Sequence, residues 1–441
     1  MLWRTIVHWP RRLRWGLFAT VLMALTLPSS TRSAAAAPIT VTYLSTQHTA
    51  AIQPVIDQFN KTHPGIHVVM QNLPFDQIFQ QIQVRLSSGS SSPDVLDVDA
   101  PVVAAYGIQG FLAPLDAVFS KHDLAELIPA ELRPCYYQGH LLALPINSSS
   151  QVLFYNKDLL KKAGIPFPPN DVHKRLTWQQ VATDARKATF RSHGQVTAWG
   201  FLIDQIDRPY QLLPLPESLG GRAISEDGLS VNGIITAPPW ITAFTWYYNL
   251  FNTWKVSPTG ATPAQTAPLF ASGHAALFWG ESRVANLFTS SKDLHWGFAP
   301  TPYFAGGKPV TPTDSWHLGV NRHSHNFAAA AEFVRYMTLG PGNDLWAKET
   351  AGFVPALVRE ARRIETDPAT AAFPGNVQRL AVYEATHTAI PRPVTPGFTE
   401  YQNILTQAFD NIRSGQSAQA ALSAAASQID SALLKYRRAP H

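Results

Sequence analysis

Polar and aromatic residues follow three predicted strands of the chain, at the point where each strand ends. Ser45–His48 follow a strand over residues 39–44, Asp99 follows a strand over 95–98, and Trp279–Arg283 follow a strand over 276–278. In an open α/β sheet, ligands bind beyond the carboxyl ends of the strands. Carboxylates and amides form paired hydrogen bonds with vicinal hydroxyls, and Trp offers a flat apolar face to a sugar ring. These residues therefore predict a binding pocket for an uncharged polyol.

Catalytic chemistry has weaker support in the sequence. Asp99 and Glu281 could face each other as the pair of carboxylates that glycoside hydrolysis needs, but no hydrolase signature surrounds either residue. The chain has no G-x-S-x-G elbow, no H-E-x-x-H motif and no phosphate-binding P-loop. His317, His323 and His325 lack the spacing and the further ligand of a zinc site. We therefore expect neither an enzyme nor a bound metal or cofactor.

The first 37 residues have the pattern of a secretory signal peptide. Four arginines precede an apolar run over residues 15–27, and the small residues at 34–37 offer cleavage sites. The apolar run is shorter than the roughly 20 residues of a transmembrane helix, although an uncleaved anchor stays the alternative. Cys135 is the only cysteine, so we expect no lipobox and interpret Cys135 as a small buried hydrophobe. The chain is expected in the periplasm or at the extracytoplasmic cell surface.

The charge balance argues against nucleic-acid binding. Of the 35 Lys and Arg residues, five lie in residues 1–37, which leaves 30 against 30 Asp and Glu in the rest of the chain. A nucleic-acid site needs Lys and Arg clustered on one face, and no such run follows residue 37. The length of this remaining part exceeds what one hydrophobic core usually supports, so we expect two lobes.

The elements that position the candidate residues alternate between strand and helix. Residues 39–44 and 66–70 predict strands from their β-branched residues, and 95–98 predicts a short buried strand. Apolar residues at helical spacing predict helices over 50–61 and 77–88. The resulting βαβαβ order indicates a parallel sheet with helices on both faces. Later in the chain, Thr177 is the predicted N-cap of a helix, with Gln180 as its capping-box partner. Further helices are predicted over 240–254, 326–339 and 418–436.

Short motifs follow one another in a fixed order along the chain. Residues 110–116 read GFLAPLD, and residues 136–165 carry a Gly turn, a Pro-Ile pair, a polar Asn-Ser-Ser-Ser segment and then YNKDLLKKAG. The segments FASGHAALF at 270–278, WHLGV at 316–320 and GFVPA at 352–356 come next. The order of these motifs resembles the extracellular solute-binding proteins of ABC importers (family 1), a family that includes the maltose- and trehalose-binding proteins.

The resemblance implies an α/β, two-lobed, periplasmic-binding-protein-like fold of type II. Each lobe is expected to be a mostly parallel sheet flanked by helices, with three segments crossing between the lobes. After the signal peptide of residues 1–37, residues 38–146 and 316–355 would form the N-terminal lobe. Residues 147–315 and 356–441 would form the C-terminal lobe. The implied protein is a monomer that binds a small carbohydrate and delivers it to the permease subunits of an ABC importer, without nucleic acid.

The resemblance also points to particular ligand-binding residues. In the sugar-binding members, an acid after the third strand, an aromatic residue at the second crossing and an Arg near a C-terminal Arg-Pro touch the ligand. The matching residues are Asp99, Trp316 and Arg392, and Gln47 stands where an acid or amide reads the first sugar. The sequence Trp-Gly-Glu-Ser-Arg at 279–283 departs from the Asn-Gly-Pro-Trp of the family. The expected ligand-binding set is Gln47, Asp99, Asn147, Trp279, Glu281, Ser315, Trp316 and Arg392.

Several of these residues have a structural alternative, and the ligand has more than one candidate. Asp99 could cap the helix that begins near Val102, Arg392 could form an ion pair that stabilises the lobes, and Arg283 could pair with Glu281. The expected ligand is a disaccharide such as trehalose or maltose. The alternatives are a glycerol-phosphate compound bound by the same fold and, third, a secreted carbohydrate-active enzyme.

Overall fold

The first sheet of the protein, seen in a computed structural model, contains the three strands that the sequence places earliest. The structure describes residues 37–313, 315–350 and 353–437, so the predicted signal peptide lies outside the described residues. The strand order is β2-β1-β3-β13-β6. The strands are β1 (Ile39–Ser45), β2 (Ile66–Asn72), β3 (Val95–Asp99), β6 (Ala143–Pro145) and β13 (Trp316–Val320). β1 runs parallel to β2 and β3, as the βαβαβ pattern predicts, whereas β13 runs antiparallel to β3 and β6.

The second sheet is built from later parts of the chain, in the order β11-β7-β10-β9-β8. Its strands are β7 (Gln151–Asn156), β8 (Phe190–Ser192), β9 (Gln195–Ile203), β10 (Ala275–Glu281) and β11 (Trp296–Ala299). Only β9 and β10 pair in parallel, while the other neighbours are antiparallel. Two small ladders join β4 (Tyr136–Tyr137) to β5 (His140–Leu141) and β12 (Thr311–Pro312) to β14 (Ala389–Ile390).

Both sheets are therefore mixed, whereas the sequence predicts mostly parallel sheets. The reason lies in the segments that pass from one sheet to the other. A strand that enters a sheet at the edge where the parallel strands end must run in the opposite direction to them. β7 enters the second sheet in this way directly after β6, and β13 enters the first sheet after the second-sheet strands. Such antiparallel strands need no crossover helix.

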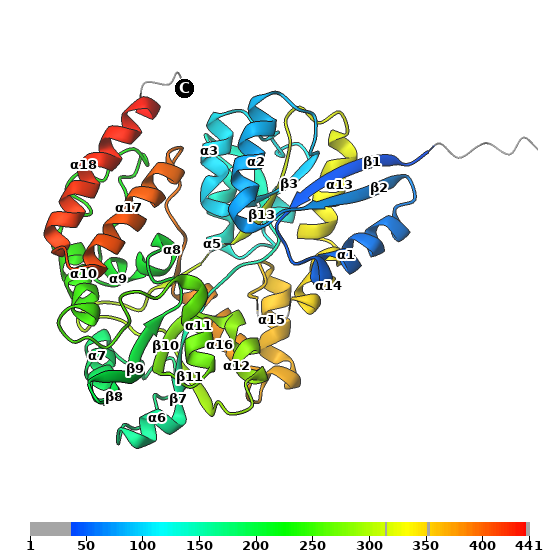
Figure 1. The fold of residues 1–441 in the computed structure, drawn as a ribbon. Helices are drawn as coiled ribbons and strands as arrows, with labels where there is room; N and C mark the ends of the chain where they lie inside the picture. Colours follow the sequence, from blue (N-terminus) through cyan, green and yellow to red (C-terminus); the bar gives the residue numbers. More distant parts are fainter. Residues whose placement is uncertain (1–36, 314, 351–352, 438–441) are drawn as a thin grey trace, which may run out of the picture. The chain divides into compact units, whose positions relative to one another are not determined.

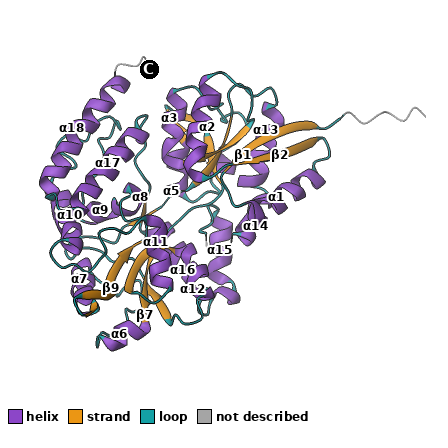
Figure 2. Ribbon diagram, in the orientation of Figure 1, coloured by secondary structure: helices purple, strands orange, loops and turns teal. Residues whose placement is uncertain are grey.

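Helices cover the faces of both sheets (Figure 1, Figure 2). Around the first sheet lie α1 (Thr49–Thr62), α2 (Phe75–Ser87), α3 (Val103–Ile108), α4 (Lys121–Leu124), α5 (Pro129–Leu132), α13 (Phe327–Thr338) and α14 (Pro341–Glu349). The others up to residue 290 are α6 (Lys157–Lys162), α7 (Trp178–Lys187), α8 (Pro209–Leu212), α9 (Pro214–Ser218), α10 (Pro238–Phe251), α11 (Pro263–Ala271) and α12 (Ala285–Ser290). The last four are α15 (Val358–Thr366), α16 (Asn376–His387), α17 (Phe398–Arg413) and α18 (Ala418–Arg437), and α17 and α18 lie together beside α10 (Figure 1).

The helices form where their apolar residues recur at helical spacing. On α1, Ile52, Val55, Ile56 and Phe59 are buried against the first sheet. The capping box of α7 is confirmed, because Gln180 N–H donates to Thr177 Oγ1 at 3.2 Å and Thr177 N–H donates to Gln180 Oε1 at 2.7 Å. Cys135 is fully buried, as expected. No helix in the described ranges is both long and apolar enough to cross a membrane.

Three segments connect the two lobes and lie against one another. They are residues 146–150, 313–316 and 354–357. The Ile146 N–H donates to Trp316 O at 3.0 Å, and the Ser148 N–H donates to Val354 O at 2.7 Å. The hydroxyl of Ser148 donates to Glu131 Oε1 at 2.6 Å, which ties this bundle to the first lobe. The two-lobed architecture with three crossings is thereby confirmed, while the residue boundaries of the lobes stay a prediction. Asp314, which belongs to the second crossing, and Gly352, which precedes the third, lie outside the described residues.

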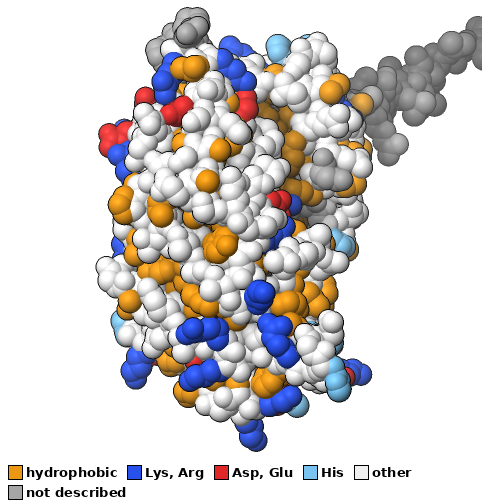
Figure 3. All heavy atoms as spheres, turned by 60° about the vertical axis from the view of Figure 1, so that its left-hand side comes forward, with side chains coloured by type: hydrophobic (Ala, Val, Ile, Leu, Met, Phe, Trp, Pro, Cys, Tyr) orange, Lys and Arg blue, Asp and Glu red, His pale blue; other side chains and the backbone are white. Residues whose placement is uncertain are grey.

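The surface carries few charges, as the 15% of charged residues in the sequence requires. On the face shown in Figure 3, Lys and Arg side chains lie chiefly in the lower part, and Asp and Glu side chains lie chiefly in the upper part. Most of the atoms on this face belong to the backbone or to uncharged side chains (Figure 3).

Candidate ligand-binding site

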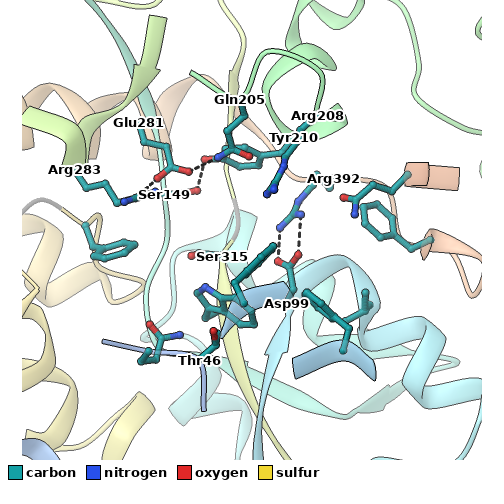
Figure 4. A pocket seen from close by; sticks show the side chains of 18 of the residues that line it. Thr46, Asp99, Ser149, Gln205, Arg208, Tyr210, Glu281, Arg283, Ser315 and Arg392 are labelled. Carbon is teal, nitrogen blue, oxygen red and sulfur yellow. Dashed lines mark hydrogen bonds and ion pairs between the residues drawn. The ribbon is translucent and has the colours of Figure 1, made fainter. Parts of the chain in front are cut away.

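A cavity of about 850 Å³ is lined by residues from both lobes. The first-lobe strands β1, β3 and β13 meet the cleft at one wall of the cavity. The loops after β9 and β10 form the opposite wall. Figure 4 shows Thr46, Asp99 and Ser315 on one side of the cavity, with Gln205, Glu281 and Arg283 on the other. The volume lies within the range of about 300–1,000 Å³ that is usual for small-molecule sites.

A buried carboxylate, Asp97, shapes the first-lobe side of the cavity. Asp97 accepts hydrogen bonds from the hydroxyls of Tyr43 and Ser45, from the Thr46 N–H at 2.8 Å and from the Gln47 side-chain amide at 3.3 Å. Burial raises the pKa of Asp97 to about 6, against the lowering effect of these donors. Asp97 therefore holds the loop after β1 in the conformation that brings Thr46 and Gln47 to the cavity wall.

An aromatic surface lies beside this loop. Trp316 begins β13, and Phe75 and Phe79 are one turn apart on α2, so both rings point to the same side of the helix. The Trp316 ring lies 6.2 Å from Phe79 with planes inclined by 22°, and 5.9 Å from Phe75 with planes inclined by 83°. We call Phe75, Phe79 and Trp316 the aromatic platform. It offers the apolar face on which a sugar ring can stack.

An ion pair between Asp99 and Arg392 crosses the cavity from β3 to the segment before α17. The Arg392 guanidinium donates to both carboxylate oxygens of Asp99, at 2.5 Å and 3.0 Å. Both side chains are largely buried, with 15% of Asp99 and 8% of Arg392 exposed. The guanidinium also lies over the rings of Tyr210, at 5.2 Å, and Phe398, at 5.8 Å. Asp99 makes no capping hydrogen bond to the helical turn that follows it. Of the two structural alternatives, a helix cap by Asp99 and an ion pair of Arg392, the structure therefore contains the ion pair.

A second charged group lies on the second-lobe side of the cavity (Figure 4). Glu281 ends β10 and accepts hydrogen bonds from the Gln205 side-chain amide at 2.8 Å and from the Arg283 guanidinium. Behind it, Asp204 is buried and accepts from the Glu281 N–H at 3.3 Å. Burial, together with the negative charge of Glu281, raises the pKa of Asp204 to about 7. This side of the cavity therefore presents both donors and acceptors.

The crossing segments supply hydroxyl groups between the two sides. Ser149 and Ser315 line the cavity, and the hydroxyls of Ser149 and Tyr210 lie 2.6 Å apart. A second hollow of about 420 Å³ adjoins the cavity and shares His48, Arg283, Thr350 and Phe353 with it. The described residues contain no group of three or more His, Cys, Asp or Glu placed to hold a metal ion.

The structure brings together six of the eight residues expected from the sequence. The six that line the cavity are Gln47, Asp99, Glu281, Ser315, Trp316 and Arg392. Their contact with a ligand stays a prediction.

Two expected residues, Trp279 and Asn147, do not line the cavity. Strand β10 continues to Glu281, three residues beyond the predicted strand, so Trp279 belongs to the sheet and not to the loop after it. Its ring is completely buried and packs 4.8 Å from the ring of Trp178 on α7. Asn147 is 2% exposed and lies within the bundle of crossings, where its amide is 3.4 Å from Ser315 Oγ. Neither side chain therefore faces the cavity in this structure, and contact of these two residues with a ligand stays a prediction.

Other lining residues were missed by the sequence analysis. Gln205, Arg208 and Tyr210 follow β9, which also ends at the cleft, so the rule about carboxyl ends of strands applies to them as well. None of the eight expected ligand-binding residues follows that strand. Phe75 and Phe79 carry a weaker signal, an aromatic pair at helical i, i+4 spacing directly after β2.

Comparisons with known proteins agree with the fold. Residues 45–340 match the family described as bacterial extracellular solute-binding protein. A binding protein of Brucella abortus is 25% identical over 96% of this chain and 99% of its own length. A mannitol-binding protein of Pseudomonas aeruginosa is 23% identical over 76% of this chain and 77% of its own. An sn-glycerol-3-phosphate-binding periplasmic protein of Yersinia enterocolitica is 29% identical over 41% of this chain and 42% of its own.

Among solved structures, the GacH receptor of Streptomyces glaucescens, determined unliganded and with acarbose, shares the fold. The TM-score is 0.74 at 23% identity, and the match covers 90% of this chain and 98% of the receptor. The family match extends over more than half of the chain and includes the second sheet and four of the five strands of the first. The chain therefore belongs to the bacterial extracellular solute-binding proteins.

Proposed function

We propose that the chain is the substrate-binding component of an ABC importer and binds a carbohydrate of disaccharide size, such as trehalose or maltose. The observation that carries this proposal is the aromatic platform of Phe75, Phe79 and Trp316 in one cavity with the polar groups of Gln205 and Glu281. A sugar has an apolar C–H face and a hydroxyl-rich edge, and the cavity presents a matching surface to each. The protein acts as an exported monomer, without a cofactor, and presents its ligand to the permease subunits.

The two lobes contribute different parts of the same cavity, which suggests how transport is coupled to binding. A ligand that contacts both lobes stabilises the arrangement in which the lobes are together, by its differential affinity for that arrangement. The three crossings, residues 146–150, 313–316 and 354–357, are the segments about which the lobes rotate. The permease then recognises the loaded arrangement of the two lobes.

Titration calorimetry with a panel of neutral monosaccharides and disaccharides tests the proposal. We expect saturable binding of at least one disaccharide, with a dissociation constant near micromolar, which corresponds to about −8 kcal/mol. The variant Trp316→Ala removes the centre of the platform and should weaken this binding. Trp254→Ala is the matched control, because Trp254 lies three residues beyond the end of α10 and is not among the described residues that line the cavity. Heat from a phosphodiester or a peptide, with none from any sugar, would refute the carbohydrate assignment.

A glycerol-phosphate compound is the second candidate ligand. It is supported by the likeness to the glycerol-3-phosphate-binding protein of Yersinia enterocolitica and by the arginines of the cavity, Arg208, Arg283 and Arg392. Two of these guanidinium groups already pair with Asp99 and Glu281, so the cavity offers less free positive charge than its arginine count suggests. For this reason we rank the glycerol-phosphate compound second.

An enzymatic function has less support than either binding function. The two carboxylates that could flank a glycosidic bond, Asp99 and Glu281, are each held by an arginine. A glycosidase needs one of its carboxylic acids as a proton donor, a role for which a carboxylate paired with a guanidinium is poorly suited. Incubation with oligosaccharides should therefore produce no new reducing ends.

A further inference from the structure

Three arginines line the cavity, and one of them has no ion-pair partner among the residues that the structure describes. Arg283 pairs with Glu281, and Arg392 pairs with Asp99. For Arg208, the described part of the chain supplies no carboxylate within ion-pair distance. Asp99 and Glu281 are the only carboxylates among the described lining residues, so these described residues together carry a formal charge of +1, with His48 counted as neutral.

The position of Arg208 places this charge at the aromatic platform. Arg208 precedes α8 in the second lobe, and its guanidinium lies 5.3 Å from the centre of the Phe75 ring in the first lobe. In Figure 4 the side chain points into the cavity, towards the side where Arg392 and Asp99 meet. A ring stacked on the platform would therefore have its edge within reach of the Arg208 guanidinium.

The acidic residues near Arg208 do not neutralise it by direct contact. Asp204 is buried beneath Glu281, and Asp207 lies 4.0 Å from the Arg413 guanidinium. Both carboxylates are close enough for the charge of Arg208 to act on them through space. The donors of Arg208 nevertheless face the cavity, where a ligand can reach them.

We infer that the carbohydrate bound in this cavity carries an anionic group, a carboxylate or a phosphate, and that Arg208 binds this group. This inference rests on the proposed carbohydrate function and names the class of carbohydrate. The planar guanidinium donates two parallel hydrogen bonds to a carboxylate or phosphate, and such charge-assisted bonds are about twice as strong as neutral ones. A neutral disaccharide would leave these donors with hydroxyl or water partners only.

Calorimetry on the full chain with four probes tests the inference. The probes are trehalose, trehalose 6-phosphate, a disaccharide that contains glucuronic acid, and sn-glycerol 3-phosphate. We expect an anionic disaccharide to bind about 10- to 100-fold more tightly than trehalose, because hydrogen bonds to charged groups contribute that much. Comparison of trehalose 6-phosphate with the disaccharide that contains glucuronic acid shows whether the cavity prefers a phosphate or a carboxylate. The preference should decrease as the salt concentration rises.

Variants of Arg208 identify the residue responsible. In Arg208→Gln, the preference for the anionic disaccharide should fall to within a few-fold of unity, while Arg208→Lys should retain part of it. Arg186→Gln is the matched control, because Arg186 lies on α7, does not line the cavity, and contacts Trp254. If Arg208 only clamps Phe75, all disaccharides lose affinity equally in Arg208→Gln, which would overturn the inference.

The remaining outcomes separate this inference from the proposed function. Equal affinity for trehalose and both anionic disaccharides would overturn the inference and leave the carbohydrate function standing. Binding of sn-glycerol 3-phosphate without any disaccharide would overturn both and select the second candidate ligand. A preference that persists unchanged in Arg208→Gln would also overturn the inference, since the anionic group would then be bound elsewhere.

Discussion

The buried carboxylate Asp97 should make the protein more stable in mild acid than at neutral pH. In the unfolded chain an Asp side chain has a pKa of about 3.9, whereas burial raises the pKa of Asp97 to about 6 in the folded protein. The folded state therefore binds a proton more tightly than the unfolded state does. The stability that this proton contributes is fully present below about pH 4 and is lost as the pH rises through about 6.

Proton linkage gives the size of the effect. Between about pH 7.5 and about pH 5, the free energy of unfolding should rise by about 1.4 kcal/mol from Asp97 alone. The raised pKa of Asp204 contributes in the same direction, whereas burial lowers the pKa of His317 to about 4 and acts in the opposite direction. The prediction therefore concerns the part of the pH dependence that Asp97 supplies. The variant Asp97→Asn removes one titrating group and should reduce the pH-dependent gain by about the same 1.4 kcal/mol.

Urea denaturation at the two pH values measures this gain for the wild-type protein and for Asp97→Asn. The quantity compared is the change in unfolding free energy with pH, because the absolute stability of the variant also reflects altered hydrogen bonds to Tyr43 and Gln47. Asp57→Asn serves as the control, since Asp57 is exposed on α1 and should keep the wild-type gain. Equal gains in the wild-type protein and Asp97→Asn would show that burial of Asp97 does not raise its pKa.

Three further substitutions probe the ion pair, the core and a helix cap. Arg392→Gln should lower the free energy of unfolding by about 3 kcal/mol, because it leaves Asp99 largely buried without its partner; in urea denaturation, the double variant with Asp99→Asn should recover part of this loss. Trp279→Ala should cost about 3–5 kcal/mol of stability by emptying the core beside α7, while the folded fraction keeps its ligand affinity in calorimetry. Thr177→Ala should cost about 1 kcal/mol by thermal or urea denaturation, since it removes the N-cap of α7.

Much of the first lobe could be predicted from local sequence patterns. The strands over 39–44, 66–70 and 95–98 form within one or two residues of their expected ends, because β-branched and apolar residues favour a half-buried or buried strand. In the second lobe, the residues by which a strand extends past its predicted end decide whether a side chain lies in the core. β10 continues through Gly280 to Glu281, and no feature of Trp279 itself distinguishes a strand residue from a loop residue. The Trp279 ring lies in the core because three antiparallel pairings with β7 extend β10 beyond Phe278.

The candidate site could be predicted only where a general rule connects sequence to the cleft. Asp99 and Glu281 are the last residues of strands that end at the cleft, so the rule about carboxyl ends finds them. Phe79 is one of the apolar residues whose spacing predicts the helix over 77–88. Whether its side of the helix packs on the sheet or faces the cavity depends on Trp316, which is more than 200 residues away in the chain. Such long-range neighbours are set by tertiary packing and leave no trace in local spacing.

The division of the cavity between the lobes leads to a final prediction about closure. The aromatic platform belongs entirely to the first lobe, so a sugar can stack on it whether or not the second lobe is close. Only contacts that depend on the arrangement of the lobes can shift the equilibrium between arrangements. The Gln205 amide reaches the cavity from the second lobe, together with Glu281. These second-lobe groups, and not the platform, should supply the differential affinity for the closed arrangement.

Two variants separate affinity from closure. Trp316→Ala should weaken binding but leave the ligand-induced change in small-angle scattering intact once the protein is saturated. Gln205→Ala should reduce that change at saturation, because the bound ligand then gains less from bringing the second lobe to the first. The saturated scattering profiles of the two variants could instead be identical to each other and to the wild type. Closure would then not depend on second-lobe contacts with the ligand. The coupling between binding and transport would have to lie in the crossings themselves.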